Sequence, residues 1–358
     1  MLECLVCTGS DLHVILDKPA VRVWTNAPDD KNKILYPCML LQCTSCGHIQ
    51  QNVDPSLQEI LNNVYSSANA QLSTVLGVGN WGTARAESIL KKIHVFGKKI
   101  LEIGCANGYI LRHLHEKNPH LELTGIEPSG ENGLIDGVHF LRAFVTSSLK
   151  LRKTFDFIFA IGVFEHVMDI RDTMRFIVDH LDQHGKLLFS VPHTESLLET
   201  GCPSLFSHEH IHYYTSSSLA RLMHDFGFYI HTIEIDRGSI YIHASRIKTT
   251  EPAAPVQLYP QYQQLLDEII AMFDSTAHHA ALHGVCNKLN NLLGWSSVKH
   301  FDLADNDETK VGKVFWGVPV KKPEQITNER LIIIPSVFFQ DIKEKYIALG
   351  YGGLLSSL

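Results

Sequence analysis

The feature that most constrains the fold of this chain is an alternation of short apolar runs with amphipathic segments. Four apolar runs, at 99–103, 121–126, 155–161 and 186–191, have the length and composition of buried strands. A chain that alternates strands with helices forms a parallel sheet, because each strand is followed by a right-handed helical crossover. The stretch that contains these runs is therefore predicted to be an α/β domain with a Rossmann-like sheet.

Helices and a hairpin complete this predicted domain. Amphipathic helices are expected at 81–96 and 109–116, and the side chain of Asp169 is expected to cap another. The apolar runs at 229–235 and 239–245 are separated by Asp-Arg-Gly, which favours a tight turn. We expect these two runs to form a hairpin that closes the sheet.

The 358 residues are enough for two or three domains of about 150 residues each. We expect a metal-binding ribbon at 1–60, the α/β domain at 61–250, and a second, smaller Rossmann-like domain at 251–358. Pro252 and Pro255 indicate a linker before the last domain. Its predicted elements are a helix at 257–277 and strands at 280–283, 298–303, 313–320 and 331–335.

Two Cys-x-x-Cys pairs near the N-terminus, Cys4 with Cys7 and Cys43 with Cys46, indicate a metal site. Two such knuckles bring four thiolates into the tetrahedron that Zn²⁺ prefers. Because four thiolates leave no open position for water, the zinc is predicted to be structural. The alternative is four reduced thiols that only fill space in a core.

The charge of the chain argues against a nucleic-acid partner. Its formal net charge is -7 and it has no run of Lys and Arg, whereas phosphate binding needs a local basic excess. No apolar stretch approaches the ~20 residues that cross a bilayer, and the N-terminus does not resemble a secretion signal. We therefore expect a cytoplasmic protein with a small-molecule substrate and no membrane partner.

The segment 100–108 ends a predicted strand and opens a predicted helix, at the sheet edge where open α/β folds bind ligands. Gly104 and Gly108 let the backbone there approach a ligand closely. Glu127 ends the next predicted strand, where a carboxylate can accept hydrogen bonds from both hydroxyls of a ribose. An NAD site is disfavoured, because the loop Gly-Cys-Ala-Asn-Gly lacks the middle glycine that a pyrophosphate needs.

With two later blocks, at 155–167 and 185–192, this loop and this carboxylate resemble the class I methyltransferases that use S-adenosylmethionine (SAM). The resemblance implies one group of residues at the methionine part of SAM, a second at its ribose, a third at its adenine and a fourth under its sulfonium. In that order they are Glu102, Gly104, Cys105, Asn107 and Gly108; Glu127 and Pro128; Ala143 and Phe144; and Ile161 and Gly162.

Three histidines alternate in the segment Ser207–Thr215, at His208, His210 and His212. On an extended chain they would share one face. From the residues alone, three readings are open: a metal site, histidines that only cap or cover the surface, or a general base that accepts a proton near neutral pH.

The order of the parts, a four-cysteine ribbon, a SAM core and a C-terminal α/β domain, resembles the C-methyltransferases of nucleotide-linked (usually dTDP-linked) 4-keto-6-deoxy sugars. This resemblance implies a role in deoxysugar biosynthesis, with His210 removing the proton at C3 and Glu209 orienting the sugar. Tyr65 matches a further site residue, and Gly238–Tyr241 matches the start of the family's hairpin, whereas Ser207 stands where the family often has tyrosine. The C-terminal domain is then expected to hold the nucleotide or to act only as a lid.

Other functions stay open at this point. O- or N-methylation of another small metabolite would use the same SAM site. Some RNA base methyltransferases also pair a four-cysteine module with a SAM core, but the acidic charge and the C-terminal domain argue against RNA. A protein that binds SAM without catalysis is disfavoured by the complete first loop and by Glu127.

Overall fold

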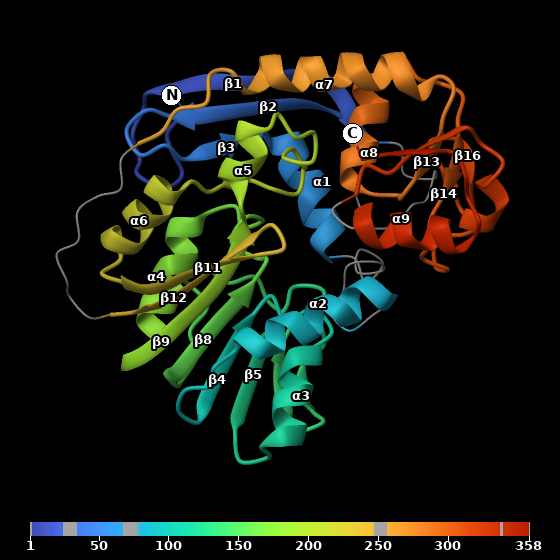
Figure 1. Cartoon of the computed structure of the whole chain (residues 1–358). Coiled ribbons are helices and arrows are strands. Elements are labelled where there is room, and N and C mark those ends of the chain that lie inside the picture. Colours follow the sequence, from blue (N-terminus) through green and yellow to red (C-terminus); the bar gives the residue numbers. More distant parts are fainter. Residues whose placement is uncertain are drawn as a thin grey trace. The chain divides into compact units, whose positions relative to one another are not determined.

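The computed structural model of the chain folds into two compact units that interleave along the sequence (Figure 1). The boundaries expected at about 60 and 250 are therefore not the boundaries of these units. Unit 1 consists of Met1–Val14, Leu40–Glu195 and Glu209–Leu258, and unit 2 of Ile15–Met39, Ser196–His208 and Tyr259–Leu358. Within these, the structure describes residues 2–23, 34–66, 77, 79–246, 256–336 and 339–357.

The main sheet of unit 1 has eight strands in the order β11-β12-β9-β8-β4-β5-β7-β6. Its five central strands are parallel, whereas β6, β11 and β12 pair antiparallel with their neighbours. The strands are β4 (Lys99–Ile103), β5 (Glu122–Ile126), β6 (Gly133–Ile135), β7 (Val138–Leu141), β8 (Phe155–Ile161), β9 (Leu181–Pro192), β11 (Tyr229–Asp236) and β12 (Ser239–Ser245).

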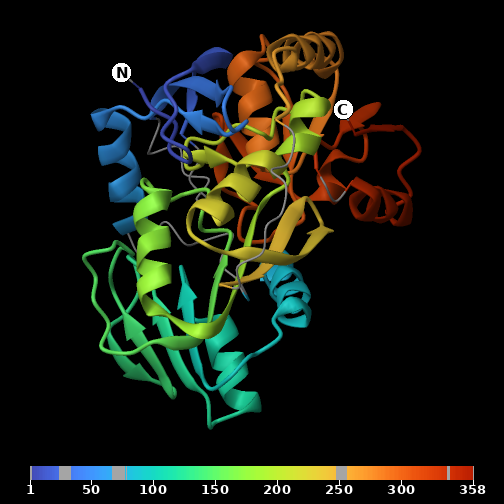
Figure 2. The ribbon, with the colours of Figure 1, turned by 90° about the vertical axis from the view of Figure 1, so that its left-hand side faces the viewer.

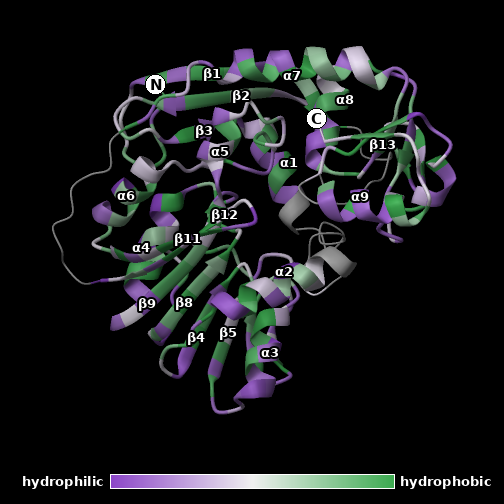
Figure 3. Cartoon of the chain, in the orientation of Figure 1, coloured by the Kyte–Doolittle hydropathy of each residue, from purple (hydrophilic) through white to green (hydrophobic). Residues whose placement is uncertain are grey.

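Helices cover both faces of this sheet (Figure 2). The central strands are apolar on both faces, as parallel strands between two helical layers must be (Figure 3). On one face, Ile100 and Phe157 pack with α2 (Gly79–Lys92) and α3 (Tyr109–Lys117). On the other face, Leu101 and Ile158 pack with α4 (Ile170–His180) and α6 (Ser216–Asp225). Asp169 caps α4 as predicted, since its Oδ1 accepts from the backbone N–H of Asp172 at 2.9 Å.

A second, smaller sheet has the order β1-β2-β3-β10, from β1 (Leu12–Arg22), β2 (Leu35–Cys43), β3 (Ile49–Gln51) and β10 (His212–Tyr213). The strand β10 pairs antiparallel with β3, so that His212 lies opposite Gln50. The first cysteine pair precedes β1, and the second begins at Cys43, the last residue of β2. Two further helices are α1 (Pro55–Ser66), which follows β3, and α5 (Thr194–Glu199), which follows β9.

Unit 2 contains a sheet of the order β15-β16-β14-β13-β17-β18, in which β13 pairs parallel with both β14 and β17. Its apolar core includes Ala281, Ile332 and Tyr346. The elements are α7 (Tyr262–Ala277), β13 (Ala281–His283), α8 (Asn287–Trp295), β14 (Asp302–Ala304), β15 (Val314–Phe315), β16 (Val318–Lys321), a 3-10 turn (Pro323–Ile326), β17 (Leu331–Ile333), α9 (Phe339–Ala348) and β18 (Leu354–Ser356).

Two hairpins differ from the predicted elements. The strand expected at 313–320 is two short strands, because Trp316 and Gly317 adopt positive φ angles of 53° and 79° and turn the chain back. The hairpin of β6 and β7 was not predicted, although Asp136-Gly137 turns it with φ angles of 49° and 77°. No helix in the part of the chain that the structure describes is long and apolar enough to cross a membrane.

Candidate cofactor and catalytic site

The loop between β4 and α3 is shaped by close packing around its two glycines. Gly104 and Gly108 have φ angles of 70° and 71°, a region that side chains rarely adopt. A Cβ on Gly104 would lie 2.4 Å from the Val163 side chain, and one on Gly108 would lie 2.5 Å from the Phe140 ring. Both glycines are predicted to let a ligand approach, and in the structure their missing Cβ atoms leave room for these two side chains.

Glu127, directly after β5, reaches across to this loop. Its Oε2 accepts from the backbone N–H of Ala106 at 3.1 Å, and its Oε1 accepts from the backbone N–H and the hydroxyl of Ser129 at 3.2 and 2.9 Å. A carboxylate has about four lone-pair positions, so it can accept further hydrogen bonds from a ligand. The predicted ribose-binding residue and the predicted methionine-binding loop are therefore brought together at one sheet edge.

Glu102, in β4, is 2% exposed, and its Oε2 has no hydrogen-bond partner among the described residues. Burial, and next the charge of Glu127, raise the pKa of the Glu102 carboxyl well above its usual range. A buried carboxyl oxygen without a partner is costly, unless a ligand supplies a donor. A SAM molecule, which carries an ammonium group and two ribose hydroxyls, fits this pair of carboxyl groups.

The other predicted cofactor residues differ in accessibility. Cys105 and Ile161 are 4% and 7% exposed and belong to the apolar core. The Asn107 Oδ1 accepts from the backbone N–H of Tyr109 at 3.2 Å, and the carbonyl of Pro128 accepts from Arg142 Nε at 3.2 Å. The residues predicted at the adenine and the sulfonium differ in their surroundings. Ala143 packs against the core, whereas Phe144, after β7, is 49% exposed. The backbone N–H of Gly162 donates to the carbonyl and to the hydroxyl of Ser190, each at 3.1 Å.

A second group of polar side chains follows β8. The nearest ligand atoms of Glu165, His166 and His210 all lie within 4.8 Å of one another. The two imidazole rings are 4.8 Å apart between centroids, and Glu165 Oε1 is 3.9 Å from His166 Nε2. Of these three residues only His210 was predicted from the sequence, although Glu165 and His166 stand in the block at 155–167 that carries the resemblance.

Hydrogen bonding and burial fix the protonation state of this cluster. His166 Nδ1 lies 2.8 Å from the carbonyl of Glu209, which can only accept, so Nδ1 carries the proton and Nε2 the lone pair. Burial lowers the pKa of His166 to about 4 and that of His210 well below its usual range, and the Arg85 guanidinium acts in the same direction. Burial raises the pKa of Glu165 to about 7 and that of Glu209 to about 8. Both imidazoles are therefore neutral, each with a lone pair on one ring nitrogen.

The three alternating histidines do not form one site. His208 belongs to unit 2, where its Nε2 donates to the carbonyl of Tyr36 at 3.0 Å. His212 is 1% exposed and bonds to His48 and to the carbonyl of Val167. His210 alone of the three belongs to a group of described side chains, with Glu165 and His166, that could hold a metal ion, so the metal and general-base roles of His210 both stay predictions. The side chain of Tyr65 lies outside the described residues.

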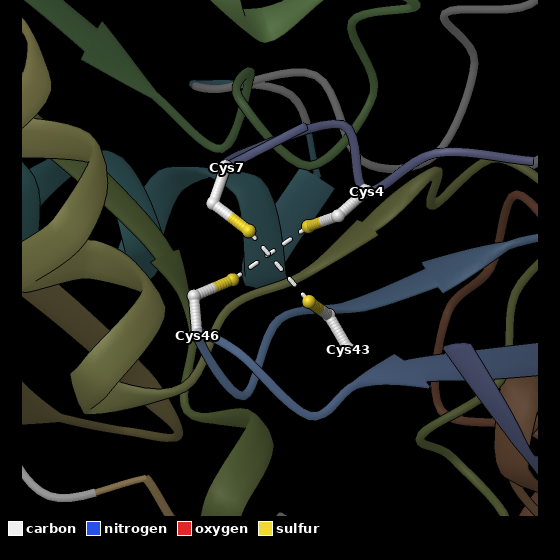
Figure 4. Close-up of side chains that lie close together, drawn as sticks. All are labelled: Cys4, Cys7, Cys43 and Cys46. Atoms are coloured by element: carbon white, nitrogen blue, oxygen red, sulfur yellow. Dashed lines mark hydrogen bonds between the residues drawn. The ribbon is translucent and has the colours of Figure 1, made fainter. Parts of the chain in front are cut away.

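The four N-terminal cysteines converge on a single point (Figure 4). The Sγ atoms of Cys4 and Cys46 are 3.6 Å apart, as are those of Cys7 and Cys43. A zinc ion with four bonds of about 2.3 Å would set thiolates about 3.8 Å apart, so the cluster fits Zn²⁺. The neighbouring Cys46 thiol lowers the pKa of Cys4 to about 5, which favours the thiolate that binds a metal. No disulfide joins the cysteines, which are all free.

Residues 82–233 match the model of a protein family described as a methyltransferase domain. This stretch, less than half of the chain, is therefore similar to a methyltransferase domain. The matched range extends from α2 to β11, and so contains the first loop, Glu127, and the cluster of Glu165, His166 and His210.

Curated relatives of this domain have varied acceptors. The chain is 24% identical over 153 residues to the malonyl-[acyl-carrier protein] O-methyltransferase of Bacillus anthracis, which covers 40% of this chain and 56% of the relative. It is 28% identical over 107 residues to the tRNA U34 carboxymethyltransferase of Nautilia profundicola, which covers 27% of this chain and 35% of the relative. The chain thus spans from about a third to just over half of the length of these relatives.

Solved structures also resemble the chain. A SAM-dependent methyltransferase from Mesorhizobium loti is 16% identical with a TM-score of 0.36, and the match covers 46% of this chain and 98% of that one. A plantazolicin methyltransferase, solved with a pentazolic desmethylPZN analogue and SAH, is 13% identical with a TM-score of 0.40, and the match covers 54% of this chain and 98% of that one.

The raised pKa of Glu165 predicts a pH-dependent stability of the methyltransferase domain. Its carboxyl has an ordinary pKa of 4.5 when unfolded and a pKa of about 7 in the folded protein. Between these values the folded state binds more protons than the unfolded state, so this group lowers stability as the pH rises through that window. The variant Glu165→Gln stays neutral. It should therefore gain on the order of 3 kcal/mol in free energy of unfolding at pH 8 and little at pH 5.

Urea unfolding at the two pH values measures this gain. The exposed Glu116→Gln in α3 is the control, and it should change stability equally little at both. A Glu165→Gln variant whose gain does not depend on pH would show that the carboxyl is ionised normally in the folded protein.

Proposed function

We propose that this chain transfers the methyl group of SAM to a carbon atom, C3 of a nucleotide-linked 4-keto-6-deoxy sugar. The observation that carries the proposal is the neutral, half-buried His210 beside Glu165 and His166. A C–H group next to a carbonyl is a weak acid, so methylation at that carbon requires a base. A neutral imidazole provides one at neutral pH.

In this proposal His210 removes the proton at C3, and the electron pair moves onto the keto oxygen as an enolate. Arg85 is suited to stabilise that oxygen, because its charge acts on Glu165, His166 and His210, and its Nη2 would lie 2.9 Å from a Cβ on Gly162. The C3 carbon would attack the methyl group that bound SAM supplies, and the S–CH3 bond would break so that S-adenosylhomocysteine leaves. Glu209, with a raised pKa, can donate a hydrogen bond to a sugar oxygen.

SAM itself is proposed to bind at the first loop of the methyltransferase domain. Glu102 would accept from the ammonium group of SAM, and this group would provide the donor that Glu102 Oε2 lacks among the described residues. Glu127 would accept from the ribose hydroxyls of SAM. The exposed ring of Phe144 is available to stack on the adenine. Gly162, at the end of β8, leaves room near the sulfonium.

The nucleotide is proposed to bind in unit 2. In its sheet β14 lies on one side of β13, and β17 and β18 lie on the other, so the order of the strands reverses between β13 and β17. Open α/β sheets bind ligands at such a point. The loop after β13 contains Gly284, over which a Cβ would meet no atom, and leads into the N-terminus of α8, which favours phosphate. Asp305 Oδ2 accepts from the backbone N–H of Val285 at 2.7 Å, with Lys310 beside it at 3.4 Å. Binding of dTDP alone to the full chain would distinguish this role from that of a lid.

O-methylation is the second candidate, favoured by the similarity to the malonyl-[acyl-carrier protein] O-methyltransferase. The carboxylate that such an enzyme methylates is already ionised, so it needs no base. Under that reading His210 and Glu165 would have no part in the chemistry.

The test is incubation with SAM labelled in its methyl group and with a dTDP-4-keto-6-deoxyhexose, malonyl-[acyl-carrier protein] or tRNA as acceptor. The proposal expects label bound to carbon in the sugar product and in no other acceptor. Label bound to oxygen, or found only in one of the other two acceptors, would contradict it.

A further inference from the structure

We propose that His48, directly behind the second cysteine knuckle, is a positioning residue for His210. The proposal deepens the proposed function and rests on His210 being its base. The cysteine cluster would then be part of the catalytic scaffold of unit 1 and not a separate module. All contacts that support this lie within unit 1.

A chain of hydrogen bonds leads from His48 to the loop after β8. His48 Nε2 lies 3.0 Å from His212 Nδ1, and His212 Nε2 lies 2.9 Å from the carbonyl of Val167. Because a carbonyl only accepts, His212 carries its proton on Nε2, and His48 must donate to its Nδ1. Consistent with this, His48 Nδ1 has no partner among the described residues. Both side chains are at most 1% exposed, so water cannot replace either bond.

The backbone beside His210 is held on both sides. The N–H groups of Ile211 and His212 donate to the carbonyl of Glu165 at 2.7 and 3.1 Å. From the other side, the N–H of Gln51 in β3 donates to the carbonyl of Ile211 at 2.9 Å. Ile211 and His212, which follow His210, are therefore held between β3 and the loop that carries Glu165 and His166.

The second cysteine knuckle also holds the chain a few residues further on, at Thr215 and Ser217. The hydroxyl of Ser217 donates to the carbonyl of Cys46 at 2.8 Å, and that of Thr215 donates to the carbonyl of Gly47 at 3.3 Å. Cys46 is one of the four cysteines that fit Zn²⁺. A shift of the second knuckle would therefore move the chain at residues 211–212 and at 215–217. A shift of about 1 Å at a catalytic group can lower the rate by about 100-fold.

The test compares His48→Phe, which keeps a ring but loses the donor, with His48→Gln, whose amide can still donate to His212. His48→Phe should lower kcat about 10- to 100-fold with KM and the SAM Kd unchanged, and His48→Gln should restore most of it. Hydrogen exchange of the amides of Gln51, Ile211 and His212 should be faster in His48→Phe, and likewise after zinc is removed by a chelator. Ser217→Ala gives a second, milder variant with the same readouts if His48→Phe does not fold.

His180→Phe is the matched control. His180 is also a buried histidine of unit 1 with two hydrogen bonds, to the carbonyl of Phe176 at 2.8 Å and from the N–H of Leu151 at 3.0 Å. It should lower stability but leave kcat and the exchange of residues 211–213 unchanged. Equal losses of kcat in both variants, or normal exchange at Ile211 in His48→Phe and Ser217→Ala, would overturn the proposal. The exchange measurements need no substrate, so they remain decisive even if the sugar is not methylated.

Discussion

Replacing His210 with asparagine is expected to lower kcat for methyl transfer by about 1,000-fold, while SAM binds as in the wild type. Asparagine keeps a polar side chain but cannot accept the C3 proton, and a general base contributes about 100- to 10,000-fold to a rate. The affinity for SAM should not change, because the proposed SAM-binding residues belong to other elements than His210. The first loop follows β4, and Glu127 follows β5. Single-turnover kinetics and calorimetry measure the two effects.

His208→Asn is the control for this variant, since it removes a histidine two residues away whose Nε2 is already bonded to Tyr36. Its kcat should stay within a few-fold of the wild type. A normal rate in His210→Asn would refute the assignment of the base, and an equal loss in both variants would indicate that the segment as a whole had moved.

Replacing Glu127 with alanine is expected to weaken SAM binding by about 100-fold, or about 2.8 kcal/mol. Charge-assisted hydrogen bonds to the ribose hydroxyls would be lost, and the loss of about 2.8 kcal/mol corresponds to one such bond at its usual strength of about 1.5–3 kcal/mol. The variant also loses the bonds from Ala106 and Ser129 to the carboxylate, so the loop would be held less firmly.

Glu131→Ala, an exposed carboxylate four residues on, is the control for charge. It should leave the SAM Kd within about twofold of the wild-type value, which is the usual scatter for a surface substitution. If Glu127→Ala bound SAM normally, the carboxylate would serve only to tie the loop.

The sequence was sufficient to predict most of the methyltransferase sheet. Strands such as Phe155–Ile161 are apolar on both faces, so their pattern depends little on the rest of the fold. The hairpin of β6 and β7 was missed because its strands have only three and four residues, of which only Val138 and Phe140 are buried. Asp136-Gly137 was nevertheless present as a turn pattern, and it could have revealed this hairpin.

Contacts between distant residues were beyond sequence reasoning. The requirement for glycine at Gly104 and Gly108 comes from Val163 and Phe140, which no local pattern links to the first loop. In the same way, β3 and β10 pair although about 160 residues separate them, so a consecutive division of the chain could not have joined the knuckle to the catalytic segment. Glu165 and His166 were visible as a polar pair after an apolar strand, which is the pattern that could have found them.

The central claim is that this chain forms a carbanion before it transfers a methyl group. The most direct measurement is exchange of the C3 hydrogen of a dTDP-4-keto-6-deoxyhexose in heavy water, with S-adenosylhomocysteine bound so that no methyl group can be transferred. Wild-type protein should replace this hydrogen with deuterium, and His210→Asn should not. Wild-type protein that leaves the C3 hydrogen in place while it methylates an oxygen of any acceptor would contradict the account.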